Sequence, residues 1–244
     1  MESAKIAYLK IKRQESPEEK PYWETALFEY SEDDTVLSLL DRLAEKAGLN
    51  STPIHHECNC REEVCGTCTI RINGVPRLSC STLIKDLPIS TKQKPIILEP
   101  LEKFPVIKDL TVDRSRISRS LSQVKNWIET DNLFSSEVKY GQEVQQEMYS
   151  YAKCIHCGSC YDACARTNKD ENKYIGPSSI AHVIKINDHP LGKKISGERL
   201  LAIMGNDGIA KCGKSMDCEK VCPKKVPLVR SLTRANREAL KKLF

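Results

Sequence analysis

The sequence has no apolar run of the roughly 20 residues that a membrane-spanning helix needs. Its first residues lack the basic-then-apolar pattern of a secretory signal. There is no glycine-rich nucleotide fingerprint and no acid–base constellation, and no repeat extends beyond the cysteine motifs. These absences argue against a membrane-spanning helix. They predict a chain that has no catalytic residue and that stays on the side of the membrane where it is made, unless a partner carries it elsewhere.

Cysteine, in contrast, is abundant. The 244 residues include twelve cysteines, and eleven of these fall into three tight groups with long cysteine-free stretches between them. A secreted disulfide framework is the alternative explanation, but such frameworks belong mainly to shorter secreted chains. Close grouping instead favours shared metal centres.

Residues 1–104 are predicted to form a small mixed sheet crossed by one helix. β-prone stretches lie at residues 6–11 and 23–30, and apolar residues recur at helical spacing over 36–47. A cysteine-rich loop follows, and Asn73-Gly74 then predicts a hairpin. The segment PIILEP supplies one more strand.

Residues 105–244 are predicted to be helical, after a proline-interrupted connection that begins near Phe104. Ile117, Leu121, Val124 and Ile128 are expected to pack as one helical stripe. Further helices are predicted at residues 143–153, 180–186, 198–204 and 228–244.

The last predicted helix, over residues 228–244, is amphipathic. Its apolar face holds Leu228, Leu232, Ala235, Leu240 and Leu243, with basic residues elsewhere. We expect it to close the second domain. Contact of its basic face with anionic lipid or an anchor subunit is the alternative.

The first cysteine group, CNCREEVCGTC, predicts a [2Fe–2S] cluster. Cys60, Cys65 and Cys68 have C-x4-C-x2-C spacing and Cys80 completes the set of four, which is the plant-type pattern. Zinc is the alternative metal, but it favours paired C-x2-C knuckles over an asymmetric loop. Cys58 lies outside the pattern and is expected to be a small buried thiol.

The second and third groups together predict two more centres. CIHCGSCYDAC has the bacterial ferredoxin spacing C-x2-C-x2-C-x3-C, in which the fourth cysteine ligates the other cluster. CGKSMDCEKVCP supplies three further cysteines, so the two runs should exchange their final ligands. The predicted [4Fe–4S] ligands are Cys154, Cys157, Cys160 and Cys222, and those of the other centre are Cys164, Cys212 and Cys218.

The other centre has only three thiolates. Ser215 stands where a full ferredoxin run would place its middle cysteine. Three ligands suit a [3Fe–4S] cluster, which lacks the iron that a fourth ligand would bind. Ligation of a fourth iron by the Ser215 oxygen is the alternative.

Histidines are not predicted to bind metal or haem. Covalent haem would need a histidine where Gly158 follows the CIHC run. His156 is expected to be a solvent-edge or hydrogen-bonding residue, and His55 and His56 to be structural. His182 has no evident role in the sequence.

The formal net charge of +5 raises nucleic acid as a partner, because basic chains attract phosphate. Eleven thiolates around oxidised clusters would lower that charge by about 6, leaving the holoprotein near neutral. Nucleic acid is therefore not predicted. The basic residues near the cysteines are expected to offset cluster charge: Arg61, Lys153, Lys211, Lys214, Lys220, Lys224 and Lys225.

The order of these motifs resembles the iron–sulfur subunits of succinate dehydrogenases and fumarate reductases, the succinate:quinone oxidoreductase family. The resemblance extends to FPVIKDLTVDRS and YIGPSSIAH, and it covers nearly the whole chain. HPLGKKISGERLLAIMGNDGIAKCGKSMDC and CPKKVPL look most like menaquinone-type members with one dihaem cytochrome b anchor. The implied fold is α+β, with an N-terminal β-grasp ferredoxin-like domain (1–104) followed by an all-α dicluster ferredoxin-like domain (105–244).

The resemblance implies the electron-transfer subunit of an enzyme, not its dicarboxylate site. Electrons would pass between FAD in a flavoprotein subunit and haem b or menaquinone at a cytochrome b-type membrane anchor. The chain would lie peripherally on the cytoplasmic face of the cell membrane, held by the anchor. The alternatives are an iron–sulfur wire of another flavoprotein oxidoreductase, or a stand-alone ferredoxin or cluster-based sensor.

The sequence departs from ubiquinone-linked members of the family. Those members carry an aromatic pair where Asn168 and Lys169 stand here, and a histidine where Gly213 follows Cys212. Ala165 also replaces the usual proline. Quinone-site residues therefore cannot be transferred to this chain.

The Ser215→Cys substitution is expected to convert the three-iron centre into a [4Fe–4S] cluster and to lower its reduction potential, because a fourth thiolate would hold the missing iron. EPR of the oxidised variant measures this. An unchanged three-iron signal would show that Ser215 does not occupy the vacant corner.

Overall fold

The computed structural model describes residues 5–47, 52–129, 139–169 and 173–242. The chain divides into two compact units, which are considered separately. The first comprises residues 1–114 together with 157–162, and the second comprises residues 115–156 and 163–244. The domain limits predicted from the sequence, 1–104 and 105–244, remain predictions.

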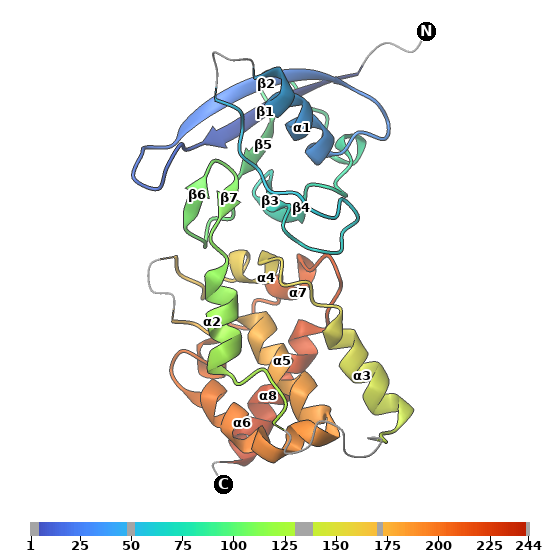
Figure 1. The fold of residues 1–244 in the computed structure, drawn as a ribbon, viewed down its shortest axis with the longest axis vertical. Helices are drawn as coiled ribbons and strands as arrows, with labels where there is room; N and C mark the ends of the chain where they lie inside the picture. The colour runs from blue at the N-terminus through green and yellow to red at the C-terminus, as the bar shows by residue number, and fades with distance from the viewer. Residues whose placement is uncertain (1–4, 48–51, 130–138, 170–172, 243–244) are drawn as a thin grey trace. The chain divides into compact units, whose positions relative to one another are not determined.

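The first unit is built on strands and the second on helices (Figure 1). The strands are β1 (Lys5–Arg13), β2 (Tyr22–Tyr30), β3 (Thr69–Ile72), β4 (Val75–Leu78), β5 (Ile96–Glu99), β6 (Val106–Lys108) and β7 (Thr111–Val112). The α-helices are α1 (Val36–Lys46), α2 (Ser115–Gln123), α3 (Gln142–Ala152), α4 (Ser159–Asp162), α5 (Pro177–Asp188), α6 (Ser196–Met204), α7 (Asp217–Lys220) and α8 (Leu228–Lys241). The 3-10 helices are η1 (Ile84–Asp86), η2 (Pro190–Ile195) and η3 (Ile209–Lys211).

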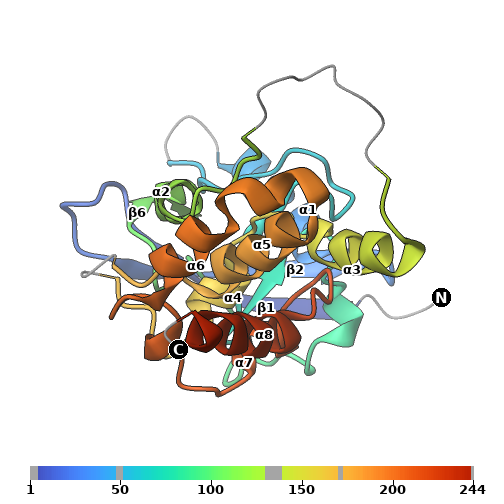
Figure 2. The same ribbon diagram turned by 90° about the horizontal axis from the view of Figure 1, so that it is seen from below.

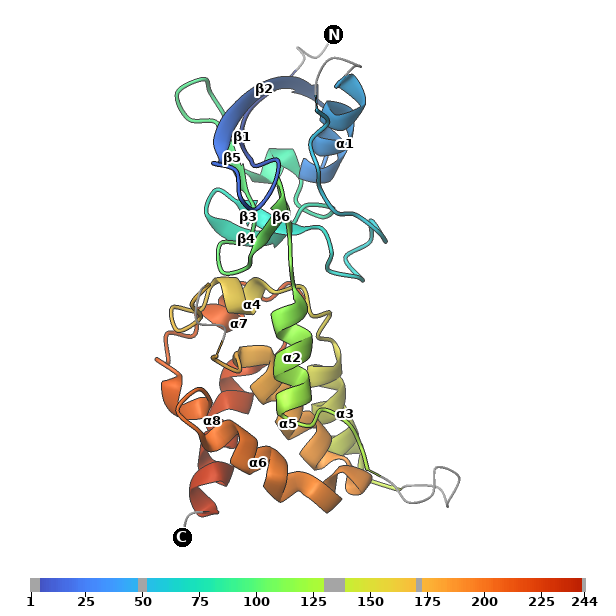
Figure 3. The same cartoon turned by 60° about the vertical axis from the view of Figure 1, so that its left-hand side comes forward.

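The sheet of the first unit is mixed, as predicted. Its strand order is β2-β1-β5-β3-β4. β1 runs antiparallel to β2 and parallel to β5, and β3 runs antiparallel to both β4 and β5. α1 lies against the curved sheet (Figure 3). The prediction of an α+β fold is confirmed.

Alternation along β1 directs its apolar side chains to one face. Ala7, Leu9 and Ile11 are buried while the residues between them are half-buried. They pack with the apolar face of α1, including Leu39 and Leu40, in one hydrophobic core. Burying each Leu or Ile side chain stabilises the fold by about 1.5–3 kcal/mol. This core fixes the sheet from which the first cysteine loop extends.

Local turn chemistry sets two of these elements. A capping box starts α1, in which the N–H of Ser38 donates to Thr35 Oγ1 and the N–H of Thr35 donates to Ser38 Oγ, both at 3.1 Å. The predicted β3–β4 hairpin turns at Asn73 and Gly74, with φ of 50° and 77°. Positive φ at both residues gives the type I′ turn that Asn-Gly favours.

The segment predicted as a plain connection contains the antiparallel pair β6–β7. Its short β-branched stretches pair around Asp109, which has a left-handed backbone (φ 46°). The fully buried Asp109 carboxylate accepts from Arg13 Nε at 2.9 Å and from the backbone N–H groups of Gln14 and His55 at 2.9 and 2.8 Å. This carboxylate joins β1, β6–β7 and the segment before the first cysteine loop.

α4 lies within the second cysteine group, yet it belongs to the first unit. Asp162 Oδ1 accepts from the backbone N–H of Lys103 at 3.0 Å, and its other oxygen lies 3.4 Å from Arg71 Nη1. The ring of Tyr161 packs against Phe104 with centroids 6.3 Å apart. Gly158, just before α4, has φ +92°, and a Cβ there would lie 3.0 Å from Phe104 Cζ. Only glycine meets both constraints without strain.

α5 is the central helix of the second unit (Figures 1 and 2). It packs against α2, α3, α6 and α8. Gly176, with φ 87°, and Pro177 at the first turn set its start, where proline lacks only an N–H that would be unpaired anyway. Its residues Ile180, Val183 and Ile184 are buried.

The helix predicted through Ile128 ends earlier, at Gln123. Lys125 has a left-handed backbone (φ 51°), and the N–H groups of Lys125 and Asn126 donate back to Ser122 and Leu121 at 3.0 Å. This is a Schellman motif, which usually places glycine at the left-handed position. Because lysine stands there instead, the end of the helix could not be predicted from the sequence.

The final helix was predicted correctly except near its end. Leu228, Leu232 and Ala235 of α8 are buried, but Leu240 is 48% exposed. Leu243 lies outside the described residues. Part of the basic face is engaged within the unit, since the Arg234 guanidinium pairs with Asp188. Among the helices in the described ranges, none has both the length and the apolar character that crossing a bilayer requires.

The Asp109→Ala substitution is expected to lower the free energy of unfolding by about 3 kcal/mol, because it removes one partner from a buried ion pair. Chemical denaturation of the full chain, kept anaerobic and followed by circular dichroism, measures this. Glu32→Ala is the control, because the Lys5–Glu32 pair is more than half exposed, and it should cause no measurable change. Equal effects of the two substitutions would contradict the structural role of Asp109.

The Gly158→Ala substitution is expected to cost about 1–3 kcal/mol, because alanine would be held at positive φ against the Phe104 ring. The unfolding midpoint and the iron content per chain should both fall. Gly205→Ala is the matched control, since nothing lies within 4 Å of a Cβ built there and its φ is −63°. A Gly158→Ala variant as stable as the control would refute the close packing.

Candidate cluster-binding sites

The first cysteine loop directs backbone N–H groups at a sulfur. The N–H groups of Glu62, Val64 and Cys65 lie 3.4, 3.3 and 3.3 Å from Cys60 Sγ. Such donors stabilise a thiolate and are a feature of iron–sulfur sites. They fit a cluster ligand at Cys60.

The backbone N–H groups of the loop can point toward Cys60 Sγ because several residues of the loop have left-handed backbones. Arg61, Glu63 and Gly66 have φ of 61°, 58° and 76°. Successive N–H groups in such a conformation form an anion-binding concavity. Nothing in the sequence pattern marked Arg61 or Glu63 for a left-handed backbone.

The four cysteines predicted to hold the [2Fe–2S] cluster lie near enough to influence one another. Burial opposes ionisation of Cys65, but hydrogen bonds with Thr67 and Cys60 outweigh it and lower the pKa of Cys65 to about 6. Burial raises the pKa of Cys80 to about 12, with further contributions from Cys68 and Cys60. The set therefore needs added positive charge to ionise fully, which iron would supply.

Cys58 is half-buried, where the sequence predicted a small buried thiol. Burial raises its pKa, and Arg61 and Cys68 are among its charged or ionisable neighbours. Its thiol is therefore disposed to stay protonated, which accords with its place outside the cluster pattern.

The second cysteine group is divided between the two units. Cys154 and Cys164 belong to the second unit, while Cys157 and Cys160 belong to the first. Cys157 Sγ lies 3.3 Å from Ser159 Oγ, and Cys160 is buried within α4. Cys222, the other predicted [4Fe–4S] ligand, belongs to the second unit, where its Sγ accepts from the Val226 N–H at 3.4 Å. Convergence of the four thiols remains a prediction.

The three cysteines predicted to hold the [3Fe–4S] cluster line one cavity in the second unit. Cys164, Cys212 and Cys218 share this cavity of about 630 Å³ with Ser215. Burial raises the pKa of Cys218 to about 12, and Cys164 and Cys212 raise it further. Ser215, which stands where the sequence pattern predicted a missing ligand, thus lines the same cavity as the three thiols.

Left-handed residues also shape this third cysteine loop. Lys214 and Met216 have φ of 57° and 62°, and Met216 immediately precedes α7, which carries Cys218. The Glu219 carboxylate accepts from the N–H of Val229 at 2.7 Å and so ties α7 to the start of α8. The loop is therefore anchored to the helical core of its unit.

Some of the basic residues expected to offset cluster charge have carboxylate partners. Such pairing weakens the field that a cation contributes at a cluster. The pairs are Arg61 with Asp41 at 2.9 Å, Lys211 with Asp207 at 3.4 Å and Lys220 with Asp217 at 3.0 Å.

Two histidines behave as the sequence predicted. His55 Nδ1 lies 2.8 Å from Thr111 Oγ1, and His56 Nε2 lies 2.9 Å from Asp41 Oδ1. Both rings therefore have structural partners.

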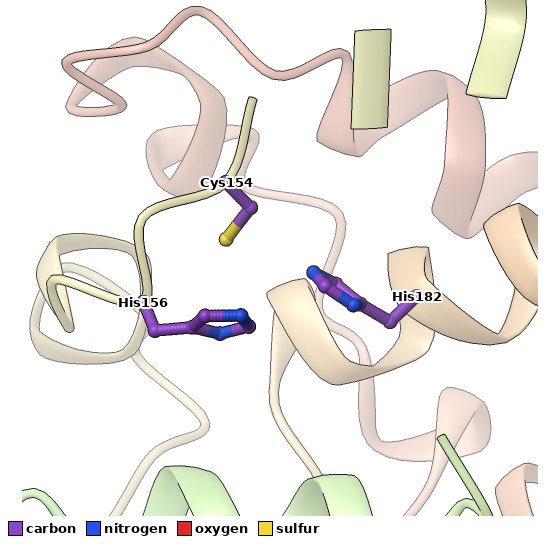
Figure 4. A group of neighbouring side chains, drawn as sticks. All are labelled: Cys154, His156 and His182. Atoms are coloured by element: carbon purple, nitrogen blue, oxygen red, sulfur yellow. The ribbon is translucent and has the colours of Figure 1, made fainter. Parts of the chain in front are cut away.

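Two other histidines flank a predicted cluster ligand (Figure 4). Cys154 Sγ and one nitrogen each of His156 and His182 all lie within 4.8 Å of one another. No role for His182 could be predicted from the sequence, because its approach to Cys154 depends on how α5 packs. No local pattern could have revealed it.

Comparisons with known proteins agree with this geometry. The family model described as a 2Fe-2S iron–sulfur cluster binding domain matches residues 8–119. The model described as a 4Fe-4S dicluster domain matches residues 150–226. The prediction of iron–sulfur cofactors is thereby confirmed.

Relatives match along most of their lengths. The Bacillus subtilis succinate dehydrogenase iron–sulfur subunit is 38% identical over 234 residues, covering 93% of this chain and 90% of the relative. The Wolinella succinogenes fumarate reductase iron–sulfur subunit is 29% identical and covers 90% of both chains. A chain of the Mycobacterium smegmatis Sdh1 complex in the apo form has a TM-score of 0.83 at 22% identity and 98% coverage of both, which supports the fold.

The similarity to the Bacillus subtilis protein is high enough, and long enough, to establish the family. Members work with a flavoprotein subunit in a succinate dehydrogenase or fumarate reductase complex. The chain belongs to the family of iron–sulfur subunits of succinate dehydrogenases and fumarate reductases, and it is an electron-transfer subunit of that class of oxidoreductase.

Proposed function

We propose that this chain carries electrons between an FAD-containing subunit and a membrane acceptor through one [2Fe–2S], one [4Fe–4S] and one [3Fe–4S] cluster. The observation that carries the proposal is the cavity lined by Cys164, Cys212, Cys218 and Ser215. It gathers three thiols from distant parts of the sequence and supplies no fourth.

The proposed ligands follow the cysteine spacing. The [2Fe–2S] cluster is held by Cys60, Cys65, Cys68 and Cys80, the [4Fe–4S] cluster by Cys154, Cys157, Cys160 and Cys222, and the [3Fe–4S] cluster by Cys164, Cys212 and Cys218. Support comes from the amide donors around Cys60 and from the mutual influence of Cys218, Cys164 and Cys212. The proposed domain limits are 1–104 and 105–244.

Bound clusters supply one-electron steps, and the protein sets how readily each step occurs. The chain's own contribution is to collect thiolates, to donate hydrogen bonds to sulfur and to exclude water from the sulfur atoms. Cys68, Cys80, Cys160 and Cys218 are buried, which keeps their sulfurs away from bulk solvent. Hydride exchange with a dicarboxylate is assigned to the flavoprotein partner.

The proposed membrane partner is a cytochrome b-type anchor containing haem b, with menaquinone as the quinone nearby. The resemblance of HPLGKKISGERLLAIMGNDGIAKCGKSMDC to menaquinone-type members supports this assignment. The chain would then be a peripheral subunit on the cytoplasmic face of the cell membrane, held there by the anchor.

Three cysteine variants of the native complex, prepared anaerobically, test the cluster assignment. Cys65→Ser, Cys157→Ser and Cys218→Ser should each abolish or alter the EPR signal of one cluster, the [2Fe–2S], [4Fe–4S] and [3Fe–4S] signals respectively. Each removes a ligand of only one proposed cluster. Cys58→Ser is the matched control and should leave all three signals intact.

The same preparation tests the partners. FAD and haem b should co-purify with the chain, together with iron and acid-labile sulfide. Zinc in place of iron, or a fully active monomer without a flavoprotein, would refute the proposed function. Loss of two signals in one variant would refute the assignment of ligands to separate clusters.

A further inference from the structure

A buried histidine of the second unit lies beside the proposed cluster ligand Cys154. His182, in the second turn of α5, is 3% exposed. Within the part of the chain that the structure describes, neither of its ring nitrogens has a partner. Figure 4 shows the Cys154 sulfur directed toward the space between the His182 and His156 rings.

Such an arrangement needs an explanation. A neutral imidazole always carries one N–H donor and one acceptor nitrogen. Buried polar groups of this kind are nearly always paired, because leaving them unpaired forfeits the hydrogen bonds that water would provide. Cys154 Sγ, which lies within 4.8 Å of a His182 ring nitrogen, offers sulfur as an acceptor.

The surroundings of His182 favour a neutral donor. Burial lowers the pKa of His182 to about 3, with further contributions from Lys185 and His156. Lys185 lies one turn further along α5, and the charges of Lys185 and Cys154 influence each other. Lys185 is itself half-buried, and burial lowers its pKa, while Cys154 acts in the opposite direction.

His156 is a weaker candidate. Its ring lies 4.9 Å from that of His182, centroid to centroid, and only its Nδ1 is both buried and unpaired. It also belongs to the cysteine loop itself, with a left-handed backbone (φ 52°), so substituting it would disturb the ligands directly.

We propose that His182 donates a ring N–H hydrogen bond to the sulfur atoms at Cys154, either the thiolate or an adjacent sulfide of the [4Fe–4S] cluster, and so raises that cluster's reduction potential. The inference rests on the proposed function, which makes Cys154 a ligand of this cluster. Reduction adds one negative charge to the cluster, and a hydrogen-bond donor to sulfur stabilises the more negative state. His182 therefore affects electron transfer through the reduction potential of the cluster and takes no part in binding iron.

Two substitutions of His182 in the native complex test the proposal by EPR-monitored redox titration. His182→Leu removes the donor and should shift the one-electron equilibrium of the [4Fe–4S] cluster toward the oxidised form by about three- to tenfold, where tenfold corresponds to about 59 mV. His182→Gln keeps an N–H donor and should recover much of the shift. His189→Gln is the matched control, because His189 Nδ1 already accepts from the Leu191 N–H at 3.3 Å, and it should change nothing.

Pulsed EPR of the reduced cluster, with ¹⁵N-labelled histidine, gives a second measurement. A weak nitrogen coupling should appear in the wild type and disappear in His182→Leu, while the [2Fe–2S] and [3Fe–4S] signals stay unchanged. A strong coupling, typical of nitrogen bound to iron, would overturn the proposal in favour of direct ligation. An unchanged potential in His182→Leu would also overturn it.

These outcomes separate the inference from the proposed function. If Cys154→Ser left the [4Fe–4S] signal intact, the ligand assignment would fail and the inference with it. If Cys154→Ser removed the signal while His182→Leu left the potential unchanged, the inference alone would fail.

Discussion

The constraint on which the structure depends is the electrostatic cost of gathering thiols where their ionised forms are unfavourable. Burial and neighbouring cysteines raise the pKa of both Cys80 and Cys218 to about 12. At neutral pH these groups would keep their protons, and only a strongly positive partner reverses that preference. Iron binding and formation of the compact state are therefore coupled. The amides around Cys60 reduce the cost locally, but they cannot remove it.

This constraint explains why the second cysteine group makes several specific packing and hydrogen-bond contacts. Position 158 accepts only glycine without strain, because its φ is positive and Phe104 lies close to it. Four residues later, the Asp162 carboxylate is bound by Lys103 and Arg71. Thiols that repel one another as thiolates must be held by contacts that do not depend on the cluster. For Cys157 and Cys160 those contacts come from the first unit, through the Lys103 backbone and the Arg71 and Phe104 side chains, so the stability of that unit contributes to the placement of ligands far along the sequence.

Much of the fold could be predicted because its signals are local. β-prone residues predicted β1, Asn73-Gly74 predicted the hairpin, and cysteine spacing predicted three groups of candidate ligands. What failed was set by tertiary contacts. α2 stops at a lysine in a left-handed conformation instead of a glycine, and just beyond it the Lys125 carbonyl accepts from Arg199 of α6 at 2.9 Å. The pair β6–β7 depends on a buried carboxylate that contacts β1. The position of His182 depends on helix packing, which no sequence period records.

The two kinds of hydrogen-bond donor near the cysteines differ in how they can be altered. Around Cys60 the donors are backbone amides, fixed by the loop conformation at Arg61 and Glu63, so they persist whatever side chains stand there. Beside Cys154 the polar groups are side chains, that of His156 in the cysteine loop and that of His182 on α5, and His182 can be replaced without rebuilding the loop that holds the thiols. Under the proposed ligand assignment, the potential of the [4Fe–4S] cluster is therefore open to change by a substitution outside its ligand loop.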